Sequence, residues 1–197
     1  MVRKWAWPNS MRSNLLLRTL TPKFHPTTMR TLFGLEILEQ CDLVDNVIIS
    51  IRGYGHIGGV GSVLKTFSLG AKIYGVATTN PMSLATSIAA GCVVKVEHLP
   101  TLAEAVAGGI DEHTITLPLA SLSVDYVLEC NEAEILQAMK LLAFQENVIV
   151  EASAALALAG FNQIALELTG QTSVVILCGG NVDQGVVDNV IYGLRES

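Results

Sequence analysis

Charged and aromatic residues are scarce in this sequence. Only 15% of its 197 residues are charged and 6% are aromatic, whereas 50% are hydrophobic and the mean hydropathy is +0.47. Disordered chains combine low hydrophobicity with high net charge, so this composition excludes disorder as the state of the whole chain. The length is sufficient for one or two domains with a buried core.

The sequence also lacks a long apolar run and a close pair of cysteines. Its longest uncharged stretch, residues 73–94, is interrupted at residues 78–81 and at Gly91, so no run of about 18 apolar residues is present to span a bilayer. The four cysteines are separated by dozens of residues and form no CxxC pair, which argues against a zinc site or a disulfide framework. We therefore expect no membrane association and a cytoplasmic location.

Acidic residues are missing from the first 30 positions, which hold six of the twelve basic residues. Their composition is similar to that of a mitochondrial transit peptide, but three prolines would break a long amphipathic helix. We expect residues 1–30 to be a poorly ordered basic leader and residues 31–197 to form a single α/β domain. That domain carries a net charge of −12, which argues against contact with the phosphates of a nucleic acid.

From residue 31 onward, apolar β-branched runs alternate with segments of helical periodicity, the pattern of a mostly parallel sheet. Strands are expected at residues 47–51, 72–77, 125–129 and 174–177. Helices are expected at residues 31–41, from the turn at 53–61 to 69, from 81 to 91, and at 132–146, 151–168 and 183–194. Strands 47–51 and 174–177 are apolar throughout, so both of their faces should be buried in a three-layer parallel sheet.

Several residues are typical of helix ends. Gly70 and Gly91 stand where a helix commonly stops, and residues 80–81 (Asn-Pro) are typical of a helix start. Asn131 and Glu134 have the spacing of a capping box, which places a helix start at residue 132.

Two glycine turns follow apolar strands and are the candidate ligand sites, because parallel α/β sheets bind ligands at the carboxyl ends of their strands. The first turn, residues 51–59, reads IRGYGHIGG. Its glycines and the helix that follows can bind an anion such as phosphate through backbone N–H groups. The second turn, residues 178–181, reads CGGN and can present one polar side chain to a flat ligand.

A Rossmann-like nucleotide-binding module is an alternative interpretation of the first turn. Gly53, Gly55 and Gly58 match the G-x-G-x-x-G pattern between a strand and a helix. That pattern requires an acidic residue about 20 positions later to hold the ribose, and the expected strand 72–77 ends without one. The dinucleotide interpretation is therefore the weaker of the two.

Five segments, taken in order, resemble the second half of the threonine/serine dehydratases, which are pyridoxal-phosphate enzymes of the tryptophan-synthase-β-like fold. These segments are residues 34–40, the turn after Ile51, and residues 99–104, 149–154 and 177–183. The resemblance covers about residues 31–190 and implies the large-domain part of pyridoxal-phosphate fold type II. Residues 96–110 are most similar to dehydratases associated with ectoine or hydroxyectoine utilisation.

The resemblance also implies which residues contact the cofactor. The residues implied at the phosphate turn are Arg52, Gly53, Tyr54, Gly55 and His56. Cys178, followed by Gly179, would face the pyridine nitrogen, and Glu151 would lie near the cofactor ring. A thiol is a weak hydrogen-bond donor, which leaves the ring nitrogen largely unprotonated and suits elimination of water. An acidic residue at a helix start also commonly compensates the helix dipole.

Three features depart from the family pattern. Arg52, Tyr54 and His56 replace small residues or leucine in the phosphate turn, and Tyr54 would be strained if its position required a positive φ. The lysine that forms a Schiff base with the cofactor lies in a Ser-x-Lys-x-Arg-Gly motif, and this motif is absent from the sequence. The acids that bind a divalent cation in some relatives have no match near residues 77–83, so no metal site is expected.

We therefore expect a truncated lyase of amino-acid metabolism that is inactive alone, with no catalytic residue assigned. In the family, water is eliminated from a β-hydroxy amino acid, and hydrolysis then yields a keto acid and ammonia. The expected ligands are a small-molecule amino acid and pyridoxal phosphate without covalent attachment, and a homo-oligomer is the expected assembly. The nucleotide-binding module and a non-catalytic remnant are the alternatives.

Overall fold

The computed structural model describes residues 3–5, 14–19, 26–51, 55–68, 70–79, 83–92, 94, 100–106 and 116–193. In chain order, the elements are β1 (Arg3–Trp5), β2 (Asn14–Thr19), α1 (Pro26–Gln40), β3 (Asn46–Ser50), α2 (His56–Phe67), β4 (Lys72–Thr78), α3 (Ser83–Ala90), the short 3-10 helix η2 (Glu104–Val106), α4 (Thr116–Ser123), β5 (Tyr126–Cys130), α5 (Glu132–Glu146), α6 (Ala152–Ile164), β6 (Thr172–Leu177) and α7 (Gln184–Tyr192).

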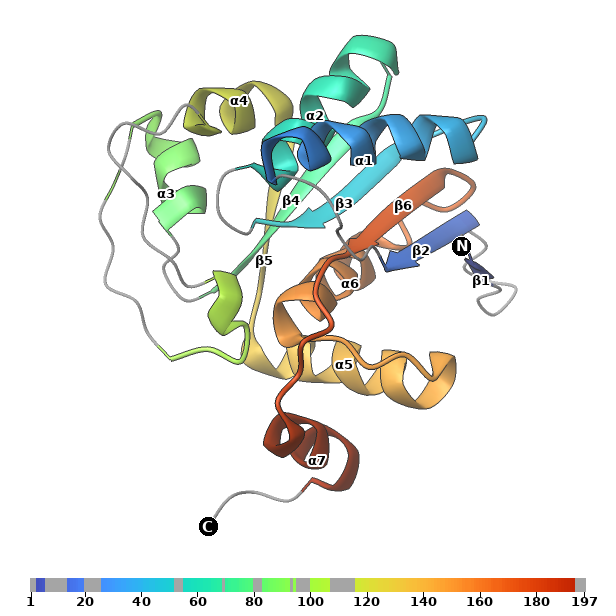
Figure 1. Ribbon diagram of the computed structural model, residues 1–197, viewed down its shortest axis with the longest axis vertical. Helices are drawn as coiled ribbons and strands as arrows, with labels where there is room; N and C mark the ends of the chain where they lie inside the picture. The colour runs from blue at the N-terminus through green and yellow to red at the C-terminus, as the bar shows by residue number, and fades with distance from the viewer. Residues whose placement is uncertain are drawn as a thin grey trace.

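These strands form one sheet in the order β1-β2-β6-β3-β4-β5 (Figure 1). All neighbours from β2 to β5 are parallel, and β1 is antiparallel to β2. Val47 of β3 is aligned with Ile73 of β4 and Val174 of β6, so the carboxyl ends of the central strands lie along one edge. The expected parallel sheet is confirmed.

The central strands direct alternate side chains into two hydrophobic cores. Ile48 packs with Val175 in the core beneath α5 and α6, while Val47 and Ile49 pack in the core beneath α1 and α2. Every residue of β3 is buried, as is β6 from its second residue onward. Figure 1 shows the two groups of helices on opposite faces of the sheet. The three-layer α/β fold follows from this alternation.

Helix α6 is buried between the sheet and α5. Every residue from Ala152 to Phe161 is buried, and the helix contacts β3, β4, β5 and β6. A Cβ atom on Gly160 would lie 2.6 Å from a side-chain carbon of Val76, so the glycine permits close contact between α6 and β4. This packing fixes the start of α6, and with it Glu151, near the carboxyl edge of the sheet.

Two of the expected helix ends are confirmed. The Asn131 side chain accepts a hydrogen bond from the backbone N–H of Glu134 (3.0 Å), and the Glu134 carboxylate accepts one from the N–H of Asn131 (2.7 Å), so the capping box is present. Helix α3 ends directly before Gly91, whose φ is +69°. The expected start at residues 80–81 lies outside the described residues.

Three expected helix boundaries are wrong. Helix α1 begins at Pro26, five residues earlier than expected. Proline has no backbone N–H, and the N–H groups of the first helical turn have no partner within the helix, so a helix can begin at this residue. Helix α2 ends at Phe67, two residues earlier than expected, because the backbone of its C-cap residue Ser68 is not helical (φ −132°, ψ 71°). Helix α6 ends at Ile164, whose carbonyl accepts from two N–H groups of the turn that follows.

Strands β1 and β2 lie within the first 30 residues. Strand β2 pairs with β6 from Asn14 opposite Thr172 to Thr19 opposite Leu177. The separate leader and its boundary at residue 30 remain predictions. In the part of the chain that the structure describes, no helix combines the length and the hydropathy needed to cross a membrane.

Candidate cofactor-binding site

Strands β3 and β6 end next to each other. These strands are neighbours, with Ile49 opposite Ile176, and the same register places Ile51 beside Cys178. The ends of these two strands therefore lie together at the carboxyl edge, where α/β sheets bind ligands. The predicted site residues that lie outside the described part of the chain are Arg52, Gly53 and Tyr54.

Helix α2 begins at His56, directly after the first turn. Gly55 is its buried N-cap residue, with φ −102° and ψ −20°, and has no side chain with which to cap the helix. The first N–H groups of a helix lack partners within the helix and carry partial positive charge, so they favour an anion. The ring of His56 lies 5.1 Å from the ring of Phe33 in α1. The start of α2 thus has the chemistry that a phosphate group requires.

The second turn brings Gly179 against Glu151. The Gly179 carbonyl accepts a hydrogen bond from the N–H of Glu151 at 3.3 Å, and a Cβ atom on Gly179 would collide with the Glu151 carboxylate. The φ of Gly179 is +133°, which other residues rarely adopt. Cys178 is half-buried and packs against the core beneath α1 and α2. The structure therefore brings Gly179 and Glu151 together, while their roles toward a cofactor remain predictions.

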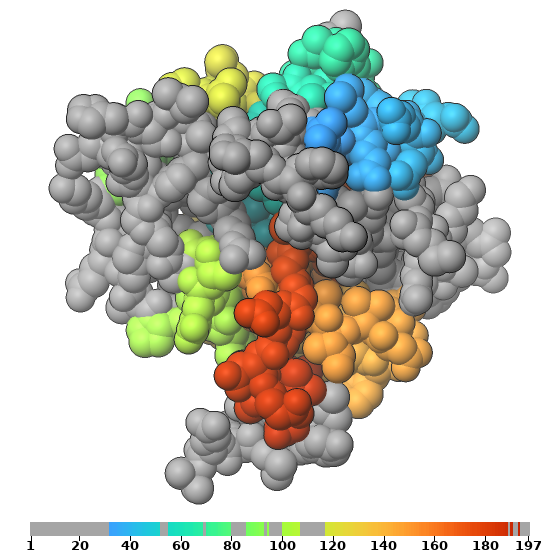
Figure 2. Space-filling model, in the orientation of Figure 1, coloured from blue at the N-terminus to red at the C-terminus, as the bar shows by residue number. Residues whose placement is uncertain are grey.

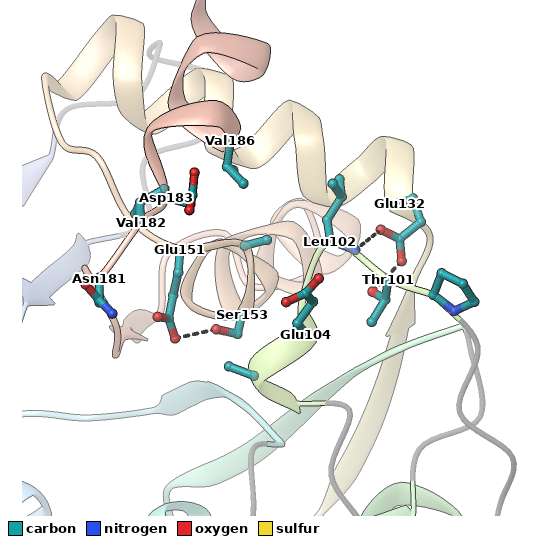
Figure 3. Close-up of a pocket in the computed structure, with 13 residues that line it drawn as sticks. Thr101, Leu102, Glu104, Glu132, Glu151, Ser153, Asn181, Val182, Asp183 and Val186 are labelled. Atoms are coloured by element: carbon teal, nitrogen blue, oxygen red, sulfur yellow. Dashed lines mark hydrogen bonds between the residues drawn. The ribbon is translucent and has the colours of Figure 1, made fainter. Parts of the chain in front are cut away.

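Glu151 is the N-cap residue of α6, but its carboxylate does not cap the helix. Its backbone carbonyl accepts the first helical hydrogen bonds, from Ala154 (2.9 Å) and Ala155 (3.1 Å). Its carboxylate accepts a hydrogen bond of 2.5 Å from the hydroxyl of Ser153, as Figure 3 shows. Compensation of the helix dipole therefore does not explain why the Glu151 carboxylate accepts a hydrogen bond from Ser153.

A cavity of about 720 Å³ opens beside Glu151. Its walls come from residues 100–105, residues 151–153, residues 181–186 and Glu132 (Figure 3). Figure 2 shows residues 100–106 and the C-terminal segment side by side on the same face of the molecule. The lining includes four carboxylates and, among the residues that the structure describes, no lysine, arginine or histidine. The cavity itself is therefore unsuited to a phosphate, in contrast to the start of α2.

One wall of the cavity is fixed by Glu132 at the start of α5. Its carboxylate accepts hydrogen bonds from the Thr101 hydroxyl (2.6 Å) and from the N–H of Leu102 (2.7 Å). These contacts join α5 to a loop 30 residues away in sequence and hold Glu104 at the cavity (Figure 3).

The lysines with described side chains lie elsewhere. Lys65 forms an ion pair with Asp125 at 2.6 Å and donates to the carbonyl of Ala71, at the amino ends of β4 and β5. Lys72 is the exposed first residue of β4, and Lys140 lies on α5. None of these three lines the cavity.

Within the described ranges, no group of three or more histidine, cysteine, aspartate or glutamate side chains is arranged to hold a metal ion. The carboxylates of the cavity are polar residues of its wall.

Sequence analysis assigned Glu151 but missed Ser153, Glu132 and Asp183 as cavity residues. Ser153 and Asp183 lie inside segments quoted for the family resemblance, which was the available signal, whereas Glu132 lies outside all of them. Their roles depend on contacts between residues such as Thr101 and Glu132, 31 positions apart, that periodicity does not reveal.

Comparisons with known proteins identify the family. A family model described as "Pyridoxal-phosphate dependent enzyme" matches residues 20–179. An L-threonine ammonia-lyase from Thermotoga maritima is 32% identical over 158 residues, covering 80% of this chain and 39% of that protein. An L-threo-3-hydroxyaspartate ammonia-lyase from Saccharomyces cerevisiae is 29% identical over 163 residues, covering 82% of this chain and 49% of that protein.

Solved structures show the same fold. A processed threonine deaminase isoform 2 from Solanum lycopersicum superposes with a TM-score of 0.77 and 26% identity, over 83% of this chain and 48% of that one. Maize serine racemase superposes with a TM-score of 0.72 and 27% identity, over 85% and 53% of the two chains. The chain thus spans about half the length of these relatives. The family model covers the first glycine turn, the start of the second and strands β3 to β6, so the chain belongs to the pyridoxal-phosphate-dependent enzyme family, with the fold-type-II architecture of the threonine dehydratases and serine racemases.

Proposed function

We propose that this chain binds pyridoxal phosphate at the turns after β3 and β6 and contributes to elimination of water from a small β-hydroxy amino acid. The observation that carries the proposal is the family match over residues 20–179, which includes two turns on neighbouring strands. Its relatives include ammonia-lyases that act on threonine and on threo-3-hydroxyaspartate. The similarity of residues 96–110 to ectoine-associated dehydratases remains a prediction.

The residues present fit the phosphate and the ring of the cofactor. The start of α2 offers the positive end of the helix dipole to a phosphate, and Arg52 adds positive charge to the same turn. Bound pyridoxal phosphate supplies an electron-withdrawing ring that stabilises negative charge on the α-carbon of an amino acid. In this proposal the thiol of Cys178 contacts the ring nitrogen as a weak donor, and the carboxylate of Glu151 lies beside the ring.

A covalently attached cofactor does not fit the lysines whose side chains the structure describes. The Ser-x-Lys-x-Arg-Gly motif is absent from the sequence, and Lys65 is bound to Asp125 at the opposite edge of the sheet. We propose that the lysine needed for the reaction comes from outside these 197 residues. Co-expression with the lysine-bearing half of a relative should therefore give a complex that absorbs visible light and retains the cofactor on desalting.

Isothermal titration calorimetry tests cofactor binding. Pyridoxal phosphate should bind reversibly and compete with inorganic phosphate, and treatment with borohydride should leave the mass of the chain unchanged. Gly55→Asp should weaken binding by about tenfold or more, because it adds negative charge where the helix start attracts an anion. Gly70→Asp is the matched control, since Gly70 is exposed and a Cβ atom there meets nothing within 4 Å.

If the chain is instead a dinucleotide-binding module, NAD or NADP should stabilise it and pyridoxal phosphate should not. A ligand that binds only the folded chain raises its melting temperature. If NAD or NADP raised it, Gly55→Asp abolished the effect and pyridoxal phosphate had none, the proposal would be wrong.

We also propose that the protein is cytoplasmic, acts on a free amino acid and forms homo-oligomers. The net charge of −12 over residues 31–197 opposes binding to nucleic acid. Light scattering after size exclusion measures the assembly directly, and a gel-shift assay with random duplex DNA should show no complex.

A further inference from the structure

We propose that Ser153 is a positioning residue, which holds the carboxylate of Glu151 at the cavity for contact with a ligand. The identity of that ligand rests on the proposed function, because pyridoxal phosphate is the group assigned to this edge of the sheet.

The first observation is the burial of Ser153. Its side chain is 1% exposed, and its hydroxyl donates to Oε1 of Glu151 at 2.5 Å. A buried hydroxyl requires a partner, and a hydrogen bond to a carboxylate is stronger than one between neutral groups. Both residues line the cavity, Ser153 as a buried residue and Glu151 as a half-buried one, and the Ser153 hydroxyl fixes the position of the Glu151 carboxylate.

The second observation is the close approach of Gly179 to the same carboxylate. Gly179 lies so close that a Cβ atom there would collide with Oε1 and Cδ of Glu151. The backbone N–H of Glu151 also donates to the carbonyl of Gly179 at 3.3 Å. Glu151 is thus held between the Ser153 hydroxyl and the backbone of the second turn, as its place in Figure 3 between Asn181 and Ser153 illustrates.

The ordinary role of an acidic N-cap residue does not explain this arrangement. A capping carboxylate accepts from the N–H groups of the first helical turn, and Glu151 makes no such side-chain hydrogen bond. Its carboxylate is directed to a cavity whose other walls come from α5, the 100–105 loop and the 181–186 segment. Fixing a charged side chain before a ligand arrives lowers the entropy cost of binding.

A double-mutant cycle on pyridoxal phosphate binding tests the inference. Ser153→Ala should weaken binding by about tenfold, the size expected for a hydrogen bond to a charged group, and leave the affinity for inorganic phosphate within about twofold. Because Ser153 acts through Glu151, adding Ser153→Ala to Glu151→Gln should cause no further loss. A full additive loss in the double variant would show a general structural effect and overturn the inference.

Ser123→Ala is the matched control. Ser123 is also a buried helical serine, 3% exposed, but its hydroxyl donates to the carbonyl of Leu119 on α4, away from the cavity. This variant should bind pyridoxal phosphate as the unaltered chain does. Equal weakening in both serine variants would contradict a specific role for Ser153.

A second measurement separates this inference from the proposed function. In the chain labelled with ¹³C at the glutamate carboxyl carbons, the resonance lost in Glu151→Gln identifies Glu151, and Ser153→Ala should shift that resonance without ligand. If it shifts but the unaltered chain does not bind pyridoxal phosphate, the proposed function fails and the contact to Ser153 stands. If the resonance stays unchanged, Ser153 does not position Glu151.

Discussion

Cys130 is the last residue of β5, and its side chain is fully buried. Burial raises the pKa of its thiol to about 12 from 9.0, and the nearby carboxylate of Glu134 adds to the increase. At neutral pH this cysteine is therefore protonated and lacks the thiolate needed for nucleophilic attack. Exposed Cys92 should react with an alkylating reagent in the folded protein, whereas Cys130 should react only after unfolding.

The raised pKa of Cys130 predicts a loss of stability in alkali. Between pH 9 and about 12 the unfolded chain has released the proton of this thiol and the folded chain retains it, so rising pH favours unfolding. The contribution to the free energy of unfolding should fall by about 1.4 kcal/mol per pH unit in that window. Urea unfolding at pH 8, 9.5 and 10.5 measures the slope, which should be shallower in Cys130→Ala. An identical slope in the variant would contradict the raised pKa.

Helix α2 shows how one set of glycines supports two interpretations. Gly58 completes the G-x-G-x-x-G pattern, yet a Cβ atom there would lie 3.2 Å from the Cβ of Leu119 in α4. A Cβ atom on Gly61 would collide with the Cβ of Ser123, also in α4. These two glycines therefore allow close packing of α2 and α4, so Gly58 has a structural role that does not require a bound ligand.

Gly61→Ala should destabilise the protein although alanine is the better helix former. Overpacking costs about 1–3 kcal/mol, and the gain in helix propensity offsets about 1 kcal/mol of it. The melting temperature should fall by about 2–4 °C for each kcal/mol lost. Gly70→Ala, with open space around its Cβ, should change stability little or raise it slightly. A Gly61 variant as stable as the unaltered chain would show that α4 moves aside at no cost.

On the scale of the whole molecule, apolar side chains remain exposed where α4 leads into β5. Leu122 is 80% exposed, and Tyr126 and Val127 of the β5 edge strand are 49% and 40% exposed. Strand β5 pairs with β4, and its own residues are mostly exposed, unlike those of β3. An edge strand with exposed apolar side chains favours association.

We therefore expect the isolated chain to self-associate and to bind a hydrophobic dye. Leu122→Lys should reduce dye fluorescence and shift the light-scattering mass toward the monomer. Leu166→Lys is the control, since Leu166 is 67% exposed but follows α6, on the other face of the sheet. A monodisperse monomer with a sharp melting transition and no dye binding would contradict this prediction.

The sequence by itself determined the central strands, several of the helices and the family. Strand and helix periodicities identified β3, β4, β6 and α5, and the Asn131–Glu134 capping box located the start of α5 to the residue. These features depend on residues within a few positions of one another, which is why they can be predicted from sequence. The order of five short segments was likewise sufficient for the resemblance to pyridoxal-phosphate enzymes, which the family match confirms.

Tertiary structure alone decided how the site is built. It placed β6 between β2 and β3, which brings residues 51 and 178 together across more than 120 positions. It also joined Glu132 to the 100–105 loop, placed Gly179 against Glu151 and left β5 exposed at the edge of the sheet. Each of these features depends on which distant residues meet once the sheet is assembled. Local patterns of hydrophobic residues and glycines do not specify that pairing.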